Sequence, residues 1–373
     1  MKKYITKHKV ETICILLMIV FSLINIYKAP LLNIKYTNHF IKQLIWIILG
    51  VIAFITTYKI RFKYILKIKY ILYALNIMML IYVLIFSKST NGIRAWINIG
   101  PLSLQPSEFI KITLPLCEID LIKNKRYFIS LTLFLIPSIL ILLEPDTGNF
   151  ILLLFIYIYL LINKNNKKII MFISIILLTI LITIILIFKF YPKIIINIFN
   201  GSLYYRCKRI IEYKNNYQIN NALIGIGSSK LLPIRLNKLL IYIPEGITDF
   251  IFSFNICNYG IIGCLLLLGI ISIFIYKLLD RYHNKLFYYK RKLLGTFLTI
   301  YIIQTLYNIF MNIGLVPIMG IPLPFISYGG SNIITYFILY SFTVKTISYK
   351  DSNNYKNNYH KGLEDKKCNH MVE

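Results

Sequence analysis

The sequence predicts an all-α polytopic membrane protein with about ten transmembrane helices, both termini cytoplasmic and a large extracytoplasmic loop between helices seven and eight. Three observations support this fold class. Of the 373 residues, 57% are hydrophobic, and they gather in runs long enough to cross a bilayer. The net charge is +28, with Lys and Arg concentrated in alternate short loops. The few acidic residues lie mostly beside the apolar runs or in the tails.

Apolar runs separated by polar or basic loops define the spans. The first run, 10–27, follows basic residues, but no small-residue cleavage site comes after it, so it is expected to remain as a helix. The fourth is the least hydrophobic because it contains Lys111, Glu118 and Asp120. The predicted helices occupy residues 10–27, 43–58, 70–87, 106–122, 127–144, 147–163, 168–190, 250–276, 293–313 and 330–347.

The distribution of positive charge predicts the orientation. Lys and Arg are enriched before the first span and in every second short loop, which the positive-inside rule assigns to the cytoplasm. Residues 1–9 then form a cytoplasmic tail, 10–347 the membrane domain and 348–373 a polar, disordered cytoplasmic tail. Anionic lipids of the inner leaflet account for the basic charge, so no nucleic acid partner is implied.

Metal binding through Cys or His is not indicated by the sequence. The six cysteines are scattered, and most lie in or near apolar spans, where they resemble small buried hydrophobic residues. The five histidines fall mostly in polar loops and tails without ligand spacing.

Acidic residues are rare on the predicted outer side. Charged groups at membrane depth cost free energy unless they face a cavity or a partner. Four of the six flank a Pro or Gly next to a span, which makes this cluster the strongest functional signal in the composition. The six are Glu108, Glu144, Asp146, Glu212, Glu245 and Asp249.

Asp249 and Glu245 stand directly before the eighth span. Asp249 can cap that helix by accepting hydrogen bonds from its free N–H groups, or it can be a functional carboxylate. Pro244 and Gly246 favour a turn, rather than a helix, around Glu245.

The turns before the fourth and sixth spans also carry acids. Asp146, in EPDTGNF, can cap the sixth span. Ser107 can cap the fourth span, with Glu108 in its first turn and Lys111 neutralising Glu108 within the bundle.

Residues 314–331, GLVPIMGIPLPFISYGGS, are apolar but broken by prolines and glycines. Irregular backbone at membrane depth is tolerated where it is buried in protein or lines a cavity, so we expect a re-entrant element on the outer face. Ser327, Tyr328 and Ser331, together with the N–H groups of Gly329 and Gly330, can bind a phosphate. The alternative is a tight turn with a serine cap on the last span.

The long loop, about 190–249, is basic and interleaved with Tyr and apolar residues, and Lys230 belongs to it. This pattern favours an amphipathic stretch on the outer leaflet that attracts an anionic lipid-linked substrate. A solvated basic loop is the alternative.

Four motifs in this order resemble the SEDS family, the FtsW, RodA and SpoVE proteins of bacterial cell-wall synthesis, and the resemblance covers roughly residues 10–347. It implies a ten-helix bundle in the plasma membrane that polymerises lipid II into glycan strands outside the membrane, for elongation, division or sporulation. It also implies a class B penicillin-binding protein as the cross-linking partner. The motifs are NGIRAWINIGPLSLQPSEFIK (91–111), EPDTG (144–148), YIPEGITDFIF (242–252) and NIFMNIGLVPIMGIPLPFISYGGS (308–331).

The resemblance gives Asp249 the role of the family's essential aspartate. Among the departures from the family pattern, Cys257 and Asn258 stand where relatives typically have two glutamates. Residues in or near the other motifs are expected to bind substrate, and these are Glu108, Lys111, Asp146, Lys230, Glu245, Pro322, Pro324, Ser327, Gly329, Gly330 and Ser331.

The implied chemistry needs one base and one source of positive charge. Asp249 would take the proton of the attacking sugar hydroxyl. The basic loop, a divalent cation such as Mg or Mn, or the N–H groups near Gly329 would neutralise the departing diphosphate.

Two alternatives of other classes remain at this stage. A flippase or transporter of the lipid-linked precursor would use the charges of the fourth span, Lys111, Glu118 and Asp120. An inactive scaffold for a penicillin-binding protein would tolerate the changes at Cys257 and Asn258.

Overall fold

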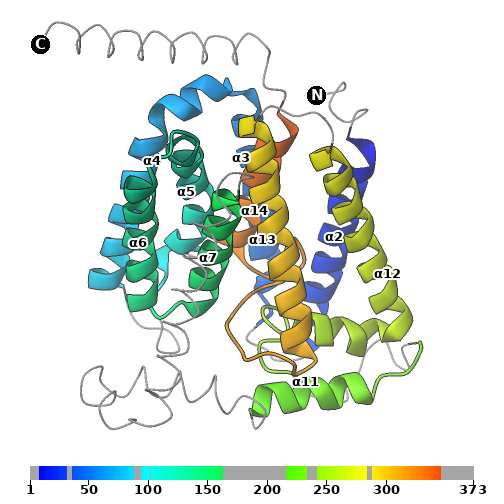
Figure 1. The fold of residues 1–373 in the computed structure, drawn as a ribbon. Coiled ribbons are helices and arrows are strands. Elements are labelled where there is room, and N and C mark those ends of the chain that lie inside the picture. The colour runs from blue at the N-terminus through cyan, green and yellow to red at the C-terminus, as the bar shows by residue number, and fades with distance from the viewer. Residues whose placement is uncertain are drawn as a thin grey trace, which may run out of the picture.

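The computed structural model describes residues 8–31, 36–87, 94–100, 102–162, 216–232, 242–283 and 288–345. These residues form a helical bundle with one short antiparallel hairpin, β1 (Ile97–Ile99) and β2 (Leu102–Leu104) (Figure 1). The helices are α2 (Lys9–Lys28), the 3₁₀ turn η1 (Ala29–Leu31), α3 (His39–Lys59), α4 (Phe62–Phe86), α5 (Pro106–Lys123), α6 (Tyr127–Leu143), α7 (Thr147–Leu161), α11 (Tyr217–Gly227), α12 (Ile251–His283), α13 (Tyr288–Asn312) and α14 (Gly330–Val344).

Nine of the ten predicted spans coincide with a helix, and the tenth, 168–190, lies outside the described residues, as do most of the long loop and both tails. The predicted starts of three spans were late: α3 begins at His39, α4 at Phe62 and α13 at Tyr288. Hydropathy marks only the apolar part of a helix, whereas Lys and Arg are good helix formers and extend it past the apolar run. Helices α2, α3, α4, α12 and α13 are long and apolar enough to cross a membrane.

The bundle exposes apolar side chains and buries polar ones, as a membrane protein requires. In α3 the buried residues are Gln43, Trp46 and Gly50, which lie on one helical face. On the other faces of the same helix, Ile48 and Ile52 are half or more exposed. Polar groups in lipid must be satisfied inside the protein, so this pattern places α3 at the lipid boundary.

Glycine notches let α3 and α14 approach closely. A Cβ added at Gly50 would lie 2.4 Å from Cδ2 of Phe337, and one added at Gly330 would lie 2.0 Å from Cε2 of Trp46. Small residues at helix crossings in membranes allow backbones to pack through direct contact. Gly330 therefore has a packing function at the start of α14.

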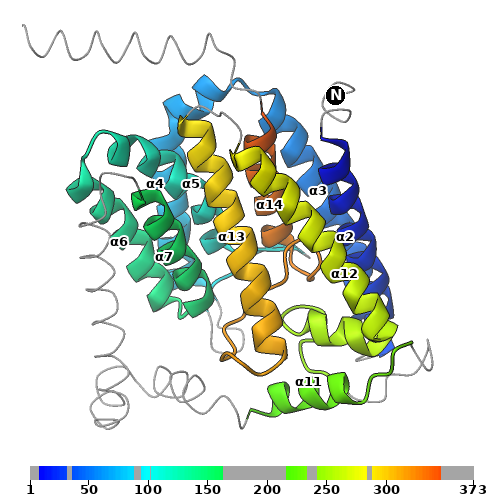
Figure 2. The ribbon, with the colours of Figure 1, turned by 45° about the vertical axis from the view of Figure 1, so that its right-hand side comes forward.

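Helix α12 consists of two segments joined at Gly260, where φ is +69°. The freed N–H groups of Ile261 and Ile262 donate to the carbonyls of Lys230 and Leu231, both at 3.2 Å. A Cβ at Gly260 would lie 2.6–2.7 Å from those same carbonyl oxygens, so only glycine fits there. The first segment lies across one end of the bundle, beside α11, and the second segment runs along it (Figures 1 and 2).

The packing of Gly330 can be tested against its neighbour Gly329. We expect Gly330→Ala to lower the stability by about 1–3 kcal/mol, because the added methyl overlaps the buried Trp46 ring. Gly329→Ala is the matched control, since its nearest atom is 3.7 Å away and its backbone is extended. Thermal unfolding in detergent measures both, and equal melting temperatures for the two variants would contradict the packing account.

Candidate functional site

One end of the bundle carries the loops that contain the motif residues. We call it the loop end; it is the lower end in Figure 1, and it is formed by residues 94–100, 102–105, 144–146, 242–250 and 313–329. The start of α2 and the end of α14 lie at the opposite end. Segments far apart in the sequence thus meet at the loop end.

The turn at residues 244–250 precedes α12, as Pro244 and Gly246 predict. Two of its carbonyls accept hydrogen bonds from the re-entrant loop 313–329. Tyr328 N donates to Ile247 O at 2.8 Å, and Ser327 Oγ donates to Thr248 O at 2.6 Å. The PLPFISYGGS motif therefore binds directly to the backbone of the PEGITDF motif.

Asp249 lies in this turn, half-buried, and its carboxylate makes no hydrogen bond or ion pair with any residue that the structure describes. Its side chain does not cap α12, so the capping interpretation is wrong. The N–H of Ser253, in the first turn of α12, donates to Oδ1 of Asn312 at 2.9 Å. A Cβ built on Gly320 would lie 3.7 Å from Oδ2 of Asp249, which places the carboxylate beside the re-entrant loop.

The charge state of Asp249 reflects its surroundings. Burial first, and then the negative charges of Glu245 and Asp146, raise the pKa of Asp249 to about 7. Glu245 lies in the same turn, where its carboxylate accepts a hydrogen bond from the Thr248 hydroxyl at 3.0 Å. A carboxylate whose pKa lies near neutrality can take and return a proton under physiological conditions.

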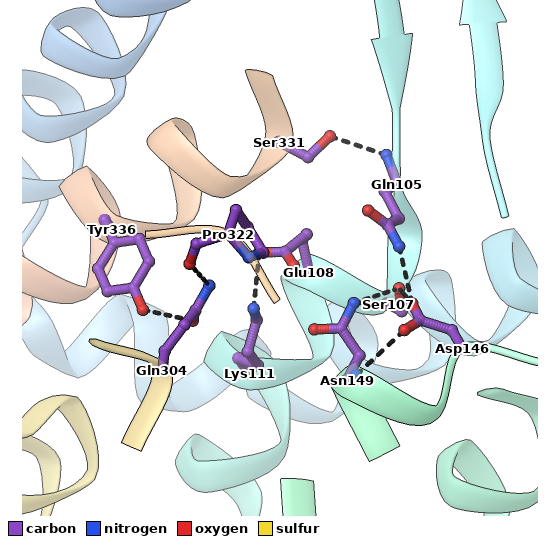
Figure 3. Close-up of polar contacts among 10 residues, drawn as sticks. All are labelled: Gln105, Ser107, Glu108, Lys111, Asp146, Asn149, Gln304, Pro322, Ser331 and Tyr336. Carbon is purple, nitrogen blue, oxygen red and sulfur yellow. Dashed lines mark hydrogen bonds and ion pairs between the residues drawn. The ribbon is translucent and has the colours of Figure 1, made fainter. Parts of the chain in front are cut away.

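Asp146 is a structural junction, and its predicted cap on α7 is confirmed: Oδ1 accepts from Asn149 N at 3.1 Å. Its other oxygen, Oδ2, accepts from the Gln105 amide at 2.7 Å, the Ser107 hydroxyl at 3.0 Å and the Asn149 amide at 2.8 Å (Figure 3). Ser107 therefore binds Asp146 and does not cap α5, which corrects the sequence prediction. Because Gln105 N donates to Ser331 Oγ at 2.8 Å, Asp146 also connects α5 and α7 to α14.

Glu108 and Lys111 form the buried ion pair that the sequence predicts in the first turns of α5. Oε2 of Glu108 lies 2.7 Å from Nζ of Lys111, and the residues are 3% and 0% exposed. Breaking a buried pair by removing one partner leaves an uncompensated charge, so the two side chains depend on each other. Figure 3 shows the pair beside the re-entrant loop at Pro322.

The re-entrant loop is held from inside the bundle, as expected for irregular backbone at membrane depth. Pro322 O accepts from the Gln304 amide at 2.8 Å, and Pro324 is buried. Ser327 Oγ, besides donating to the turn, accepts from Leu323 N at 2.7 Å. The hydroxyls of Ser327 and Ser331 both bind groups of the protein, whereas Gly329 is partly exposed at the N-terminus of α14.

The structure does not bring Lys230 together with the other predicted site residues. Its side chain is exposed, and its carbonyl binds the α12 kink at Ile261. The structure thus brings Asp249, Glu245 and Asp146 into electrostatic contact, and it keeps Glu108 and Lys111 as a separate buried pair.

The sequence analysis missed three amides of α13: Gln304, Asn308 and Asn312. All are fully buried. Asn308 donates to Asp249 O at 2.9 Å and to Ile321 O at 2.8 Å, while Asn312 donates to Asp249 O at 3.0 Å. The available signal was their spacing, because polar residues at every fourth position of an apolar span mark one inward face.

The chain is similar to known proteins over most of its length. The family model for FtsW, RodA and SpoVE, described as "Cell cycle protein", matches residues 8–352. The probable peptidoglycan glycosyltransferase FtsW of Wigglesworthia glossinidia brevipalpis is 31% identical over 331 residues, 82% of each chain. The peptidoglycan glycosyltransferase MrdB of Helicobacter pylori is 27% identical over 356 residues, 87% of this chain and 89% of the relative.

Two solved structures share the architecture. Thermus thermophilus RodA superposes with a TM-score of 0.63 at 21% identity, over 90% of this chain and 94% of that chain. A chain from a structure described as "Structural coordination of polymerization and crosslinking by a peptidoglycan synthase complex" gives a TM-score of 0.73 at 20% identity, over 90% and 95% of the two chains. With a family match over most of its length and this multi-pass helical fold, the chain belongs to the FtsW, RodA and SpoVE family.

Proposed function

We propose that this protein is a peptidoglycan glycosyltransferase that polymerises lipid II into glycan strands at the outer face of the plasma membrane, with Asp249 as the general base. The observation that carries the proposal is the state of the Asp249 carboxylate. It is half-buried, it has no partner among the described residues, and its pKa is raised to about 7. The names of the relatives support the activity. In this proposal the loop end faces outward and both chain ends face the cytoplasm.

The reaction transfers a sugar from a polyprenyl diphosphate to a sugar hydroxyl. The oxygen of the acceptor forms a bond to the anomeric carbon as the bond between that carbon and the diphosphate oxygen breaks. The acceptor proton passes to the Asp249 carboxylate, and the diphosphate leaves with the electron pair. Two lipid-anchored substrates present their sugars at the membrane surface, which accounts for a base at the edge of the bundle.

The leaving diphosphate needs positive charge or hydrogen-bond donors. The partly exposed N-terminus of α14 at Gly329 and the exposed Lys230 are two candidates among the described residues. In the described ranges no three Asp, Glu, His or Cys side chains form a group that could hold a metal ion.

The other residues predicted to bind substrate are proposed to support the base from a distance. We propose that Glu245 and Asp146 set the charge around Asp249. Glu108 and Lys111 shape the floor of the substrate site in this proposal. A third group of residues fixes the re-entrant loop against that site: Pro322, Pro324, Ser327, Gly330 and Ser331. A class B penicillin-binding protein is the proposed cross-linking partner, in elongation, division or sporulation. The neighbouring structure described as a synthase complex for polymerisation and cross-linking supports such a partner.

Contacts in α5 weigh against a transporter. Asp120 forms an ion pair with Lys69, and Glu118 accepts a hydrogen bond from Ser130. Such internal partners are typical of structural ties between helices, whereas a transport pathway needs charges that reach a cavity. Asn258, at a family glutamate position, donates to Asn25 at 3.4 Å and so joins α12 to α2, which supports an intact fold despite that change.

The proposal that Asp249 is the general base can be tested by one substitution. Asp249→Asn keeps the size and polarity of the side chain but cannot take a proton, so it should abolish lipid II polymerisation by the purified protein, with or without a transpeptidase partner. Because the side chain caps nothing, the variant should unfold within a few degrees of wild type. Full activity in the Asn variant would assign the base elsewhere, and an inactive wild type would favour the scaffold alternative.

The pH dependence of the activity provides another test of the base. Asp249 acts as a base only when ionised, so activity should fall about tenfold per pH unit below its pKa of about 7. Glu245→Gln removes a negative charge that raises this pKa, and the acidic limb of the pH–rate profile should therefore move to lower pH. Asp280→Asn, at the far end of α12, is the control and should leave the limb unchanged. A limb that stays in place in Glu245→Gln would contradict the assigned coupling.

The buried Glu108–Lys111 ion pair can be tested through its effects on stability and activity. Lys111→Met leaves the Glu108 carboxylate buried and unpaired, which should cost about 3–5 kcal/mol of stability. The double variant Glu108→Gln/Lys111→Met removes both charges and should recover most of the lost stability. Thermal unfolding measures the recovery. A double variant that folds but polymerises poorly supports a role in substrate binding, whereas normal activity confines the pair to structure.

A further inference from the structure

Three consecutive carbonyls before α12 are bound by groups outside that helix. In a regular helix that began one turn earlier, the carbonyls of residues 247, 248 and 249 would accept from N–H groups four residues on. Here Ile247 O accepts from Tyr328 N, Thr248 O from Ser327 Oγ, and Asp249 O from two asparagine amides of α13. These donors prevent the helix from extending back through Asp249.

One amide takes the place of the helical hydrogen bond at Asp249. Asn312 donates from Nδ2 to Asp249 O at 3.0 Å and accepts at Oδ1 from Ser253 N at 2.9 Å and Ser253 Oγ at 2.7 Å. It therefore binds both main-chain groups that would otherwise pair as residues i and i+4 of a helix. Asn312 is fully buried, so water does not compete for these groups.

Asn308 binds the main chain of both Asp249 and the re-entrant loop. Its Nδ2 donates to Asp249 O at 2.9 Å and to Ile321 O at 2.8 Å. The residue before Ile321 is Gly320, the part of the re-entrant loop that lies beside Oδ2 of Asp249. Asn308 thus fixes the separation between the Asp249 backbone and the loop segment that faces its side chain.

We infer that Asn308 and Asn312 are positioning residues for the base: they hold Asp249 in the turn, two residues before the start of α12, with its carboxylate directed at the re-entrant loop and free of hydrogen bonds from the described residues. This inference rests on the proposed function for its kinetic consequence. A base displaced by about 1 Å can lose on the order of 100-fold in rate, so such positioning matters to catalysis.

The test compares Asn312→Leu, which has nearly the same size but no amide, with Asn25→Leu. Asn25 is the matched control because it is also fully buried and also binds the first segment of α12, through Asn255 Oδ1 at 2.6 Å, but it does not contact Asp249. We expect Asn312→Leu to lower kcat for lipid II polymerisation roughly 10- to 100-fold while KM changes by less than about twofold. Asn25→Leu should lose stability and keep its kcat.

Hydrogen exchange of residues 249–254 provides a second readout that does not depend on activity. Asn312→Leu frees the Ser253 N–H and should raise exchange in this segment, whereas Asn25→Leu should not. If Asn312→Leu fails to fold, Asn308→Leu replaces it, since that variant leaves one of the two bonds to Asp249 O in place.

The outcomes separate the two proposals. Normal kcat in a folded Asn312→Leu, unchanged exchange, or an equal loss of kcat in Asn25→Leu would overturn the positioning role. An inactive wild type would overturn the glycosyltransferase assignment, while the exchange data would still decide whether Asn312 holds the turn.

Discussion

The structure depends on one constraint: backbone N–H and C=O groups that lie away from water must find partners within the protein. A re-entrant loop and an irregular turn at membrane depth expose many such groups. This chain satisfies them with side chains that project inward from the spans, above all Gln304, Asn308 and Asn312 of α13. The same bonds that stabilise the irregular backbone also give the loop end its defined shape.

Four carboxyl groups at or beside the loop end show how environment divides one chemistry into several roles. Glu108 is neutralised by an adjacent ammonium, and Asp146 is saturated by hydrogen bonds from three residues. Glu144 is fully buried with neither oxygen hydrogen-bonded in the described part of the chain. Asp249 alone among these combines partial exposure, an unpaired carboxylate and negative neighbours that raise its proton affinity. These differences in environment, in addition to the motif, support the proposal that Asp249 accepts the proton.

Hydropathy was sufficient to predict nine helices in the described residues, because lipid exposure demands long apolar runs. The Glu108–Lys111 pair and the Asp146 cap were also predictable, since both are interactions within one or two turns of a helix. The role of Ser107 was mistaken and the amides of α13 were overlooked because their partners are distant in sequence. Hydrogen bonds between Asn312 and Ser253, 59 residues apart, are a property of the packed bundle and leave no local pattern.

The break at Gly260 divides α12 into two stretches under different selection. Residues 261–283 run along the bundle, and on their outward face side chains such as Leu265 and Leu266 are exposed, so any apolar residue of similar length serves at those exposed positions. Residues 251–259 lie across the loop end and bind specific amides on α2 and α13. Among descendants of this gene, residues 251–259 should change together with their distant partners, whereas the exposed positions of 261–283 should vary with the thickness and composition of the host membrane.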